Sequence, residues 1–166
     1  MPEITFGFAL CGSFCTFDTV IDEMREISEK GYRMLPVMSG TAYSTDTRFG
    51  RAKDFVWQVQ DICGRSVLHS IIEAEPIGPK KLVDLMIVAP CTGNTLGKLA
   101  CGITDTTVTM AVKSCLHADL PIVLAPSTDD MLAVSPQNIG RLINTKHIYF
   151  VPMRRGRSDG EPDSAL

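Results

Sequence analysis

Short apolar runs alternate with stretches of helical periodicity along the chain. The apolar runs predict strands at residues 4–10, 32–38, 84–89, 121–125 and 147–152. Apolar side chains spaced three and four residues apart predict helices at residues 17–30, 52–63, 94–101, 107–118 and 136–143. Residues 66–74 fit a short helix or a strand, and residues 39–51, rich in Gly, Thr and Ser, predict a long loop. Strands that alternate with helices predict an α/β fold with a parallel sheet covered on both faces.

Small polar residues follow four of the predicted strands. Gly12 and Ser13 come after the first strand, Ser39 after the second, and residues 90–95 and 126–128 after two later ones. The carboxyl ends of parallel strands share one edge of the sheet, so we expect these groups to meet in one crevice. Hydroxyl groups and free N–H groups at helix starts bind phosphate. The pattern predicts a site for a phosphorylated cofactor or substrate, although Gly12 and Ser13 alone also fit a simple tight turn.

The same junctions favour a mononucleotide over a dinucleotide. The chain has no Gly-x-Gly-x-x-Gly after its first strand, and Ser39 stands where an acidic residue would hold the ribose of NAD.

The junction at residues 90–95 carries the most specific chemistry. We expect Pro90 to end its strand and Gly93 to permit an unusual backbone angle. Asn94 offers a donor and an acceptor to a ligand, or caps the helix that follows. Cys91 is the one thiol that we place in the crevice.

Charged and imidazole side chains supply further candidates. Arg48, in the predicted loop, either clamps a carboxylate or pairs with Asp46. Lys98 lies one helical turn after Asn94 and is able to face the same crevice. Three histidines lie away from the predicted strand ends and are expected to be structural: His69, His117 and His147. No set of His, Cys and Asp has the spacing of metal ligands, so no metal site is predicted.

Composition limits the class of protein. The chain has 166 residues, of which 45% are hydrophobic and 21% charged, which suits a single globular domain. Together with the alternation of strands and helices, this predicts a Rossmann-like three-layer αβα sandwich. We assign residues 1–153 to this domain and 154–166 to a polar, flexible tail. A net charge of −3 argues against nucleic-acid binding, and no apolar run is long enough to span a membrane. Six cysteines without CxxC spacing, and no signal peptide, predict free thiols and a cytoplasmic location.

Four segments together resemble the flavoprotein family of FMN-binding cysteine decarboxylases and flavin prenyltransferases. They are Gly12–Ser13, Ser39, residues 89–100 and residues 125–131. The resemblance covers nearly the whole chain and implies FMN as the cofactor. Transferred by position, it implies that three residues hold the flavin phosphate, three lie near the isoalloxazine or substrate, and two line the far side. In that order these are Gly12, Ser13 and Ser39, then Thr92, Asn94 and Thr95, then Ser127 and Met131. Gly93 and Thr128, which lie in the same segments, are also counted as cofactor-binding residues.

A narrower resemblance, to one branch of this family, is carried by residues 45–50, 74–80 and 145–152. It implies one subunit of a two-subunit oxidoreductase in the mother cell of a sporulating bacterium. The partner subunit would carry NADP, and the pair would oxidise a dihydro-level dicarboxylate to an aromatic pyridine dicarboxylate. The family also implies a homo-oligomer. Asn94, Arg48 and Lys98 are the candidate catalytic residues.

Two departures from the family pattern keep other functions open. The decarboxylases carry a catalytic His after the second strand, whereas residues 39–44 contain none, so decarboxylation by that route is not expected. Members of the branch continue past residues 162–164 into a further helical segment, whereas this chain ends at Leu166. The alternatives are a standalone FMN-dependent decarboxylase or flavin prenyltransferase, and a scaffold subunit without catalysis.

Overall fold

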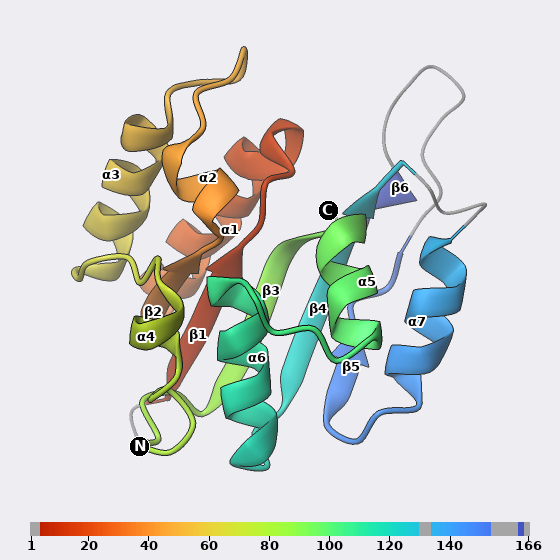
Figure 1. Ribbon diagram of the computed structural model, residues 1–166. Helices are drawn as coiled ribbons and strands as arrows, with labels where there is room; N and C mark the ends of the chain where they lie inside the picture. Colours follow the sequence, from red (N-terminus) through yellow and green to blue (C-terminus); the bar gives the residue numbers. More distant parts are fainter. Residues whose placement is uncertain (1–3, 130–133, 154–162, 165–166) are drawn as a thin grey trace.

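A β-sheet of six strands forms the centre of the computed structural model, which describes residues 4–129, 134–153 and 163–164 (Figure 1). Five strands run parallel in the order β2-β1-β3-β4-β5, and β6 pairs antiparallel with β4. The strands are β1 (Thr5–Leu10), β2 (Arg33–Met38), β3 (Leu85–Thr92), β4 (Ile122–Thr128), β5 (Ile148–Phe150) and β6 (Asp163–Ser164).

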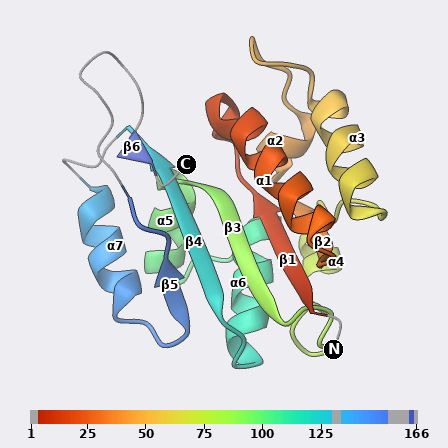
Figure 2. The ribbon, with the colours of Figure 1, turned by 180° about the vertical axis from the view of Figure 1, so that it is seen from behind.

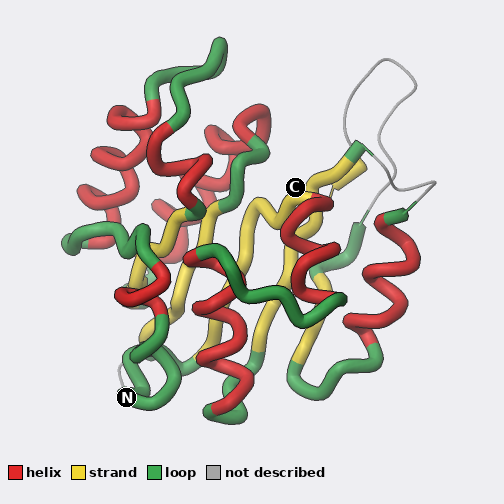
Figure 3. Tube along the Cα trace, viewed as in Figure 1, coloured by secondary structure: helices red, strands yellow, loops and turns green. Residues whose placement is uncertain are grey.

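Helices cover both faces of this sheet. Helices α1 and α3 pack on one face, and α4, α5, α6 and α7 on the other, as the two opposite views show (Figures 1 and 2). Strands and helices alternate along the chain (Figure 3). The predicted α/β fold is therefore confirmed. The helices are η1 (Phe14–Thr16), α1 (Phe17–Glu29), α2 (Gly40–Ser44), α3 (Ala52–Cys63), α4 (Ile71–Ala74), α5 (Gly93–Ala100), α6 (Thr107–His117) and α7 (Ser135–Ile143).

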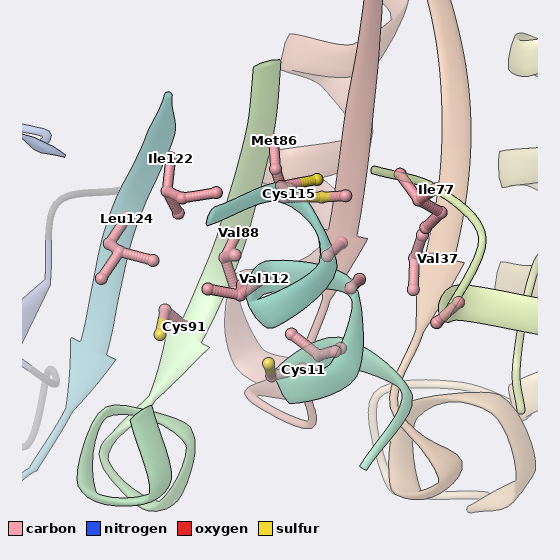
Figure 4. Packing of buried hydrophobic residues seen from close by; sticks show 14 of the residues in the cluster. Cys11, Val37, Ile77, Met86, Val88, Cys91, Val112, Cys115, Ile122 and Leu124 are labelled. Carbon is pink, nitrogen blue, oxygen red and sulfur yellow. The ribbon is translucent and has the colours of Figure 1, made fainter. Parts of the chain in front are cut away.

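Alternation of side chains along the strands builds two cores, one on each face. In β3, Met86 and Val88 join the core under α6, whereas Ile87 packs against the core under α1 and α3. Ile122 and Leu124 of β4 extend the core under α6 (Figure 4). Because both faces are buried, these strands read as continuous apolar runs in the sequence.

The helix ends follow the residue types that predicted them. Gly31 (φ +85°) and Gly64 (φ +64°) lie in the left-handed region just after α1 and α3, where other residues are disfavoured. Thr16 is the residue before α1, and its hydroxyl donates to the carbonyl of Ser13 (2.8 Å) and does not cap the helix.

Pro90 does not end its strand, contrary to our expectation. The Ala89–Pro90 peptide is cis, and the register between β3 and β4 shifts between Val88 and Cys91. This irregularity lets β3 continue, so that Thr92 pairs with Ser127. Glycine is needed at position 93 because the backbone there lies close to Thr128, and not because of an unusual backbone angle. A Cβ at this position would lie 2.8 Å from Thr128 Oγ1.

The structure also defines residues 39–51 and 66–74, for which the sequence predicted a loop and either a helix or a strand. The predicted loop at 39–51 contains α2, whose N-cap Ser39 accepts a hydrogen bond from the Ala42 N–H (3.2 Å). Within residues 66–74, Leu68 pairs in parallel with Val37 of β2, and the short helix α4 follows.

Two further predictions concern membrane-spanning segments and the C-terminal tail. Among the described residues, no helix is long and apolar enough to cross a bilayer. Most of the predicted tail, residues 154–162 and 165–166, lies outside the described residues, and only Asp163–Ser164 is placed, as β6 beside β4. The boundary at residue 153 stays a prediction.

Candidate functional site

A cavity of about 570 Å³ opens at the carboxyl edge of the sheet. Its wall comes from the junctions after β1, β2 and β3 and from the starts of α4 and α6. Ligand pockets in proteins are commonly of this size. The cavity is therefore the candidate binding site.

Four helices begin at this cavity, and their N-cap residues all line it: Ser39 of α2, Ser70 of α4, Thr92 of α5 and Thr106 of α6. Each cap hydroxyl accepts a hydrogen bond from the backbone N–H three residues later. A hydroxyl caps a helix without adding negative charge. The backbone dipoles of α2, α5 and α6 consequently direct partial positive charge toward the cavity, which suits an anionic ligand. At α4 the Glu73 carboxylate accepts from the Ser70 N–H (2.9 Å) and offsets this charge.

The structure brings most of the predicted cofactor-binding residues to this edge. Five of them line the cavity: Gly12, Ser39, Thr92, Asn94 and Thr95. The hydroxyls of Ser13 and Ser127 hydrogen-bond each other (2.8 Å) and so join the junctions after β1 and β4. The hydroxyl of Thr128 hydrogen-bonds Ser135 (3.1 Å) beside Gly93. Met131 lies outside the described residues.

Cys11, and not Cys91, is the thiol in the cavity wall. Because β3 continues past Pro90, Cys91 is fully buried in the core beneath α6 (Figure 4). The Thr95 hydroxyl donates to Cys11 Sγ (3.2 Å), yet burial still raises the pKa of the Cys11 thiol. Burial also raises the pKa of Cys91 well above its usual value. Both thiols stay protonated at neutral pH, which argues against a nucleophilic role.

Asn94 is the second residue of α5 and does not cap it, because Thr92 takes that role. Its side chain is exposed, lines the cavity and makes no hydrogen bond within the described part of the chain. The amide is therefore free to contact a ligand.

Lys98 is one step removed from the cavity. Its ammonium donates to Asp105 Oδ1 (2.7 Å), and Asp105, not Lys98, lines the wall. This hydrogen bond holds the pKa of the Asp105 carboxyl below its usual value. Lys98 thus neutralises the acid that stands just before α6.

Replacing Lys98 by methionine should raise the pKa of Asp105 toward its ordinary value, because the donor to the carboxylate is lost. The ion pair is present above the usual pKa of an aspartate and is lost as the pH falls through the lowered pKa. An NMR titration of the side-chain carboxyl carbons measures the change. An unchanged Asp105 titration in Lys98→Met would contradict the pairing.

Arg48 lies outside the cavity wall. It sits in the turn between α2 and α3, with its guanidinium 4.8 Å from the centroid of the exposed Phe49 ring. No ion pair joins it to Asp46 among the described residues, since Asp46 Oδ1 accepts from the Ala52 N–H (2.8 Å) at the start of α3. Its role as a carboxylate clamp stays a prediction.

His69 lines the cavity, although we expected it, like the other histidines, to have a structural role. Leu68 pairs with Val37 and exchanges backbone hydrogen bonds with Pro36 and Met38 (both 2.9 Å). His69 therefore leaves a short extended segment at the same edge as the other junctions. Its ring stacks on Tyr43, with centroids 4.0 Å apart.

A signal for His69 was present in the sequence. Val67 and Leu68 form an apolar pair that is followed at once by His69 and Ser70, the same apolar-then-polar pattern as at the other junctions. Thr106 and Thr107 were also missed as site residues, although they begin a helix that the periodicity predicted.

Within residues 4–129, 134–153 and 163–164, no group of three or more His, Cys, Asp or Glu side chains is placed to hold a metal ion. The wall offers hydroxyls, backbone N–H groups, one amide, one imidazole, the Cys11 thiol and the Asp105 carboxylate.

Comparison with known proteins agrees with this fold. A family model described as Flavoprotein matches residues 1–157. The B subunit of dipicolinate synthase from Bacillus subtilis (strain 168) is 39% identical over 96% of this chain and 80% of its own length. The crystal structure of the corresponding dipicolinate synthase chain from Bacillus halodurans has 38% identity and a TM-score of 0.80, and the match covers 90% of this chain and 77% of that one.

A more distant structure shows the fold alone. Burkholderia xenovorans DmrB, solved in complex with FMN and described as a cubic protein cage for redox transfer, has 21% identity and a TM-score of 0.71. That match covers 90% of this chain and 88% of DmrB. From the family model and the Bacillus relatives together, the chain belongs to the flavoprotein family, within which it is a homologue of the B subunit of dipicolinate synthase.

Proposed function

We propose that this chain acts as the B subunit of dipicolinate synthase, an oxidoreductase. In this role it takes part in oxidising a dihydrodipicolinate-level intermediate to dipicolinic acid in the mother cell of a sporulating bacterium. The identity to the Bacillus protein over nearly the whole chain supports the assignment. The observation that carries it is the cavity at which α2, α5 and α6 begin, each capped by a hydroxyl and without an acidic residue in its first turn, because such a wall suits a ligand with several negative charges.

The wall residues fit FMN. At Gly12 a Cβ would lie 3.1 Å from Thr41 Cγ2, so glycine keeps the backbone open between β1 and α2. Asp105 is the one carboxylate among the described wall residues, and Lys98 neutralises it. We assign the flavin phosphate to Gly12, Ser13 and Ser39, the contact between the ring and the substrate to residues 92–95, and the far side to Ser127 and Thr128. When bound, FMN supplies a two-electron acceptor.

In the proposed reaction this chain has two roles, to accept a proton and to orient the substrate. Formation of the aromatic ring removes one hydride and one proton from the dihydro substrate. We assign the proton to His69, the only imidazole among the described wall residues. The helix starts and the Asn94 amide would orient the carboxylates, and a bound flavin or a nicotinamide on the partner protein would supply the hydride acceptor.

We assign NADP to that partner, the A subunit of dipicolinate synthase. We also propose that the chain forms a homo-oligomer, which the cage assembly of the Burkholderia protein supports by analogy of fold.

The test is reconstitution. The purified chain, once mixed with the A subunit, should form dipicolinate from a dihydrodipicolinate-level substrate, and neither protein on its own should do so at a comparable rate. Flavin absorbance of the purified chain reports whether FMN is held. Full activity of the A subunit on its own would make this chain a scaffold and would refute the catalytic role.

A standalone FMN-dependent decarboxylase or flavin prenyltransferase is a second candidate, because His69 supplies the cavity with an imidazole that the segment 39–44 lacks. It predicts turnover by the FMN-loaded chain without any partner. Release of CO2 from a carboxylate substrate, or prenylation of added flavin, by the chain alone would support it.

A further inference from the structure

Thr107, the first residue of α6, is a buried polar residue whose hydroxyl lacks a partner. It is only 4% exposed and lines the cavity. Its hydroxyl makes no hydrogen bond to any residue in the described part of the chain. No fully buried side-chain oxygen or nitrogen among the described residues is left without a partner, so the Thr107 hydroxyl keeps some accessible surface in a residue that lines the cavity. A hydroxyl with no protein partner is open to a hydrogen bond with a ligand or with solvent.

The backbone around Thr107 offers further donors. Thr106 caps α6 through the N–H of Thr109 (3.1 Å), so the N–H groups of Thr107 and Val108 precede the first hydrogen bonds within the helix. No acidic residue occupies the first turn of this 11-residue helix. The nearest carboxylate, Asp105, is already paired with Lys98.

The start of α5 faces the same cavity with a similar arrangement. Thr92 caps it, the N–H groups of Gly93 and Asn94 precede its first helical hydrogen bonds, and the Asn94 amide is free. Two regular helices thus present separate sets of donors to one cavity. A ligand with a single anionic group would engage only one of them.

We infer that the start of α6, with the Thr107 hydroxyl, is a subsite for one carboxylate of a dicarboxylate substrate. The start of α5, with Asn94, takes the second carboxylate. This inference rests on the proposed function and assigns its substrate end, whereas the flavin phosphate belongs at the β1 junction. Thr107 is a specificity-determining residue, because its hydroxyl favours a dicarboxylate over a related monocarboxylate.

Binding of pyridine-2,6-dicarboxylate and of FMN, measured separately by calorimetry, tests the inference. Thr107→Val removes the hydroxyl and keeps the branched shape, whereas Thr107→Ser keeps the hydroxyl. Thr104→Val is the matched control, since Thr104 lies in the same loop but outside the wall of this cavity. The thermal unfolding of each variant is also measured, so that a loss of binding caused by misfolding is detected.

In Thr107→Val, the Kd for the dicarboxylate should rise roughly ten-fold or more, as expected for a lost hydrogen bond to a charged group. The Kd for FMN should not change, Thr107→Ser should restore dicarboxylate binding, and Thr104→Val should behave as wild type. In the reconstituted two-protein enzyme, KM should rise more than kcat falls. Binding of pyridine-2-carboxylate, which has one carboxylate, should change less than binding of the dicarboxylate.

Three results would overturn the inference. They are an unchanged dicarboxylate Kd in Thr107→Val, a rise in the FMN Kd without a rise for the dicarboxylate, and no dicarboxylate binding by the wild type. Failure of the proposed function is a separate result, namely no dipicolinate from the wild-type chain in the reconstituted enzyme. The binding measurements decide the inference even then.

Discussion

Replacing Gly78 by alanine should lower the free energy of unfolding by about 3 kcal/mol or more. A Cβ at this position would lie 1.9 Å from the carbonyl oxygen of Ser114 and 2.6 Å from its carbonyl carbon. The obstacle is the backbone of α6, which has no rotamer to change. The segment that follows α4 would therefore have to move away from the helix.

That segment is held closely by the side chain of the same serine. The Ser114 hydroxyl donates to the carbonyl of Glu75 (2.6 Å) and accepts from the N–H of Gly78 (2.8 Å). Between these contacts, Ile77 is fully buried in the core under α6. Moving the segment would break both hydrogen bonds and expose Ile77.

Urea unfolding followed by circular dichroism measures this loss. Gly140→Ala in α7 is the control, because a Cβ there meets nothing within 4 Å. In a helix interior that exchange should be neutral or stabilise by up to about 1 kcal/mol. Equal midpoints for Gly78→Ala and wild type would refute the close packing of this segment on α6.

Replacing Gly12 by valine should weaken FMN binding roughly a hundred-fold or more while leaving the fold intact. Gly12 lines the cavity, and a Cβ there already comes within 3.1 Å of Thr41 Cγ2. The two further methyl groups of valine would fill the space through which an anion approaches the backbone N–H groups after β1. The core is not involved, so thermal stability should change little.

Gly12→Ala should weaken FMN binding less than Gly12→Val does, because the Thr41 methyl is able to shift by a few tenths of an ångström to make room for one Cβ. Its FMN affinity should fall between those of valine and wild type. Fluorescence quenching of FMN gives the dissociation constants, and a melt in the absence of ligand gives the stability. Unimpaired FMN binding by a folded Gly12→Val protein would place the phosphate elsewhere.

Periodicity and helix-ending residues were sufficient to predict the architecture. Gly31 and Gly64 marked the ends of α1 and α3 because their left-handed backbone is local in origin. The continuation of β3 past Pro90 was not predictable in this way. It depends on a register shift against β4, which is a contact between segments more than 30 residues apart in sequence.

In the candidate site, too, some residues were predictable from the sequence and others were not. Gly12, Ser39 and residues 92–95 follow recognisable strands, so their meeting at one edge followed from the topology of parallel sheets. His69 reaches the cavity only because Leu68 lies beside β2, a pairing too short to give a strand pattern. The exclusion of Lys98 and Arg48 from the wall depends on side-chain partners, Asp105 and Phe49, that periodicity does not specify.

The hydroxyl-capped starts of α2, α5 and α6 carry an electrostatic cost for the fold, since like ends of three dipoles are held together. Any anion that occupies the cavity relieves this repulsion, and ligand binding to the native state alone raises the melting temperature. Phosphate or sulfate in a storage buffer should therefore stabilise the protein and compete with its natural ligand. Thermal shifts measured across a series of buffer anions would report directly on how strongly the cavity attracts negative charge.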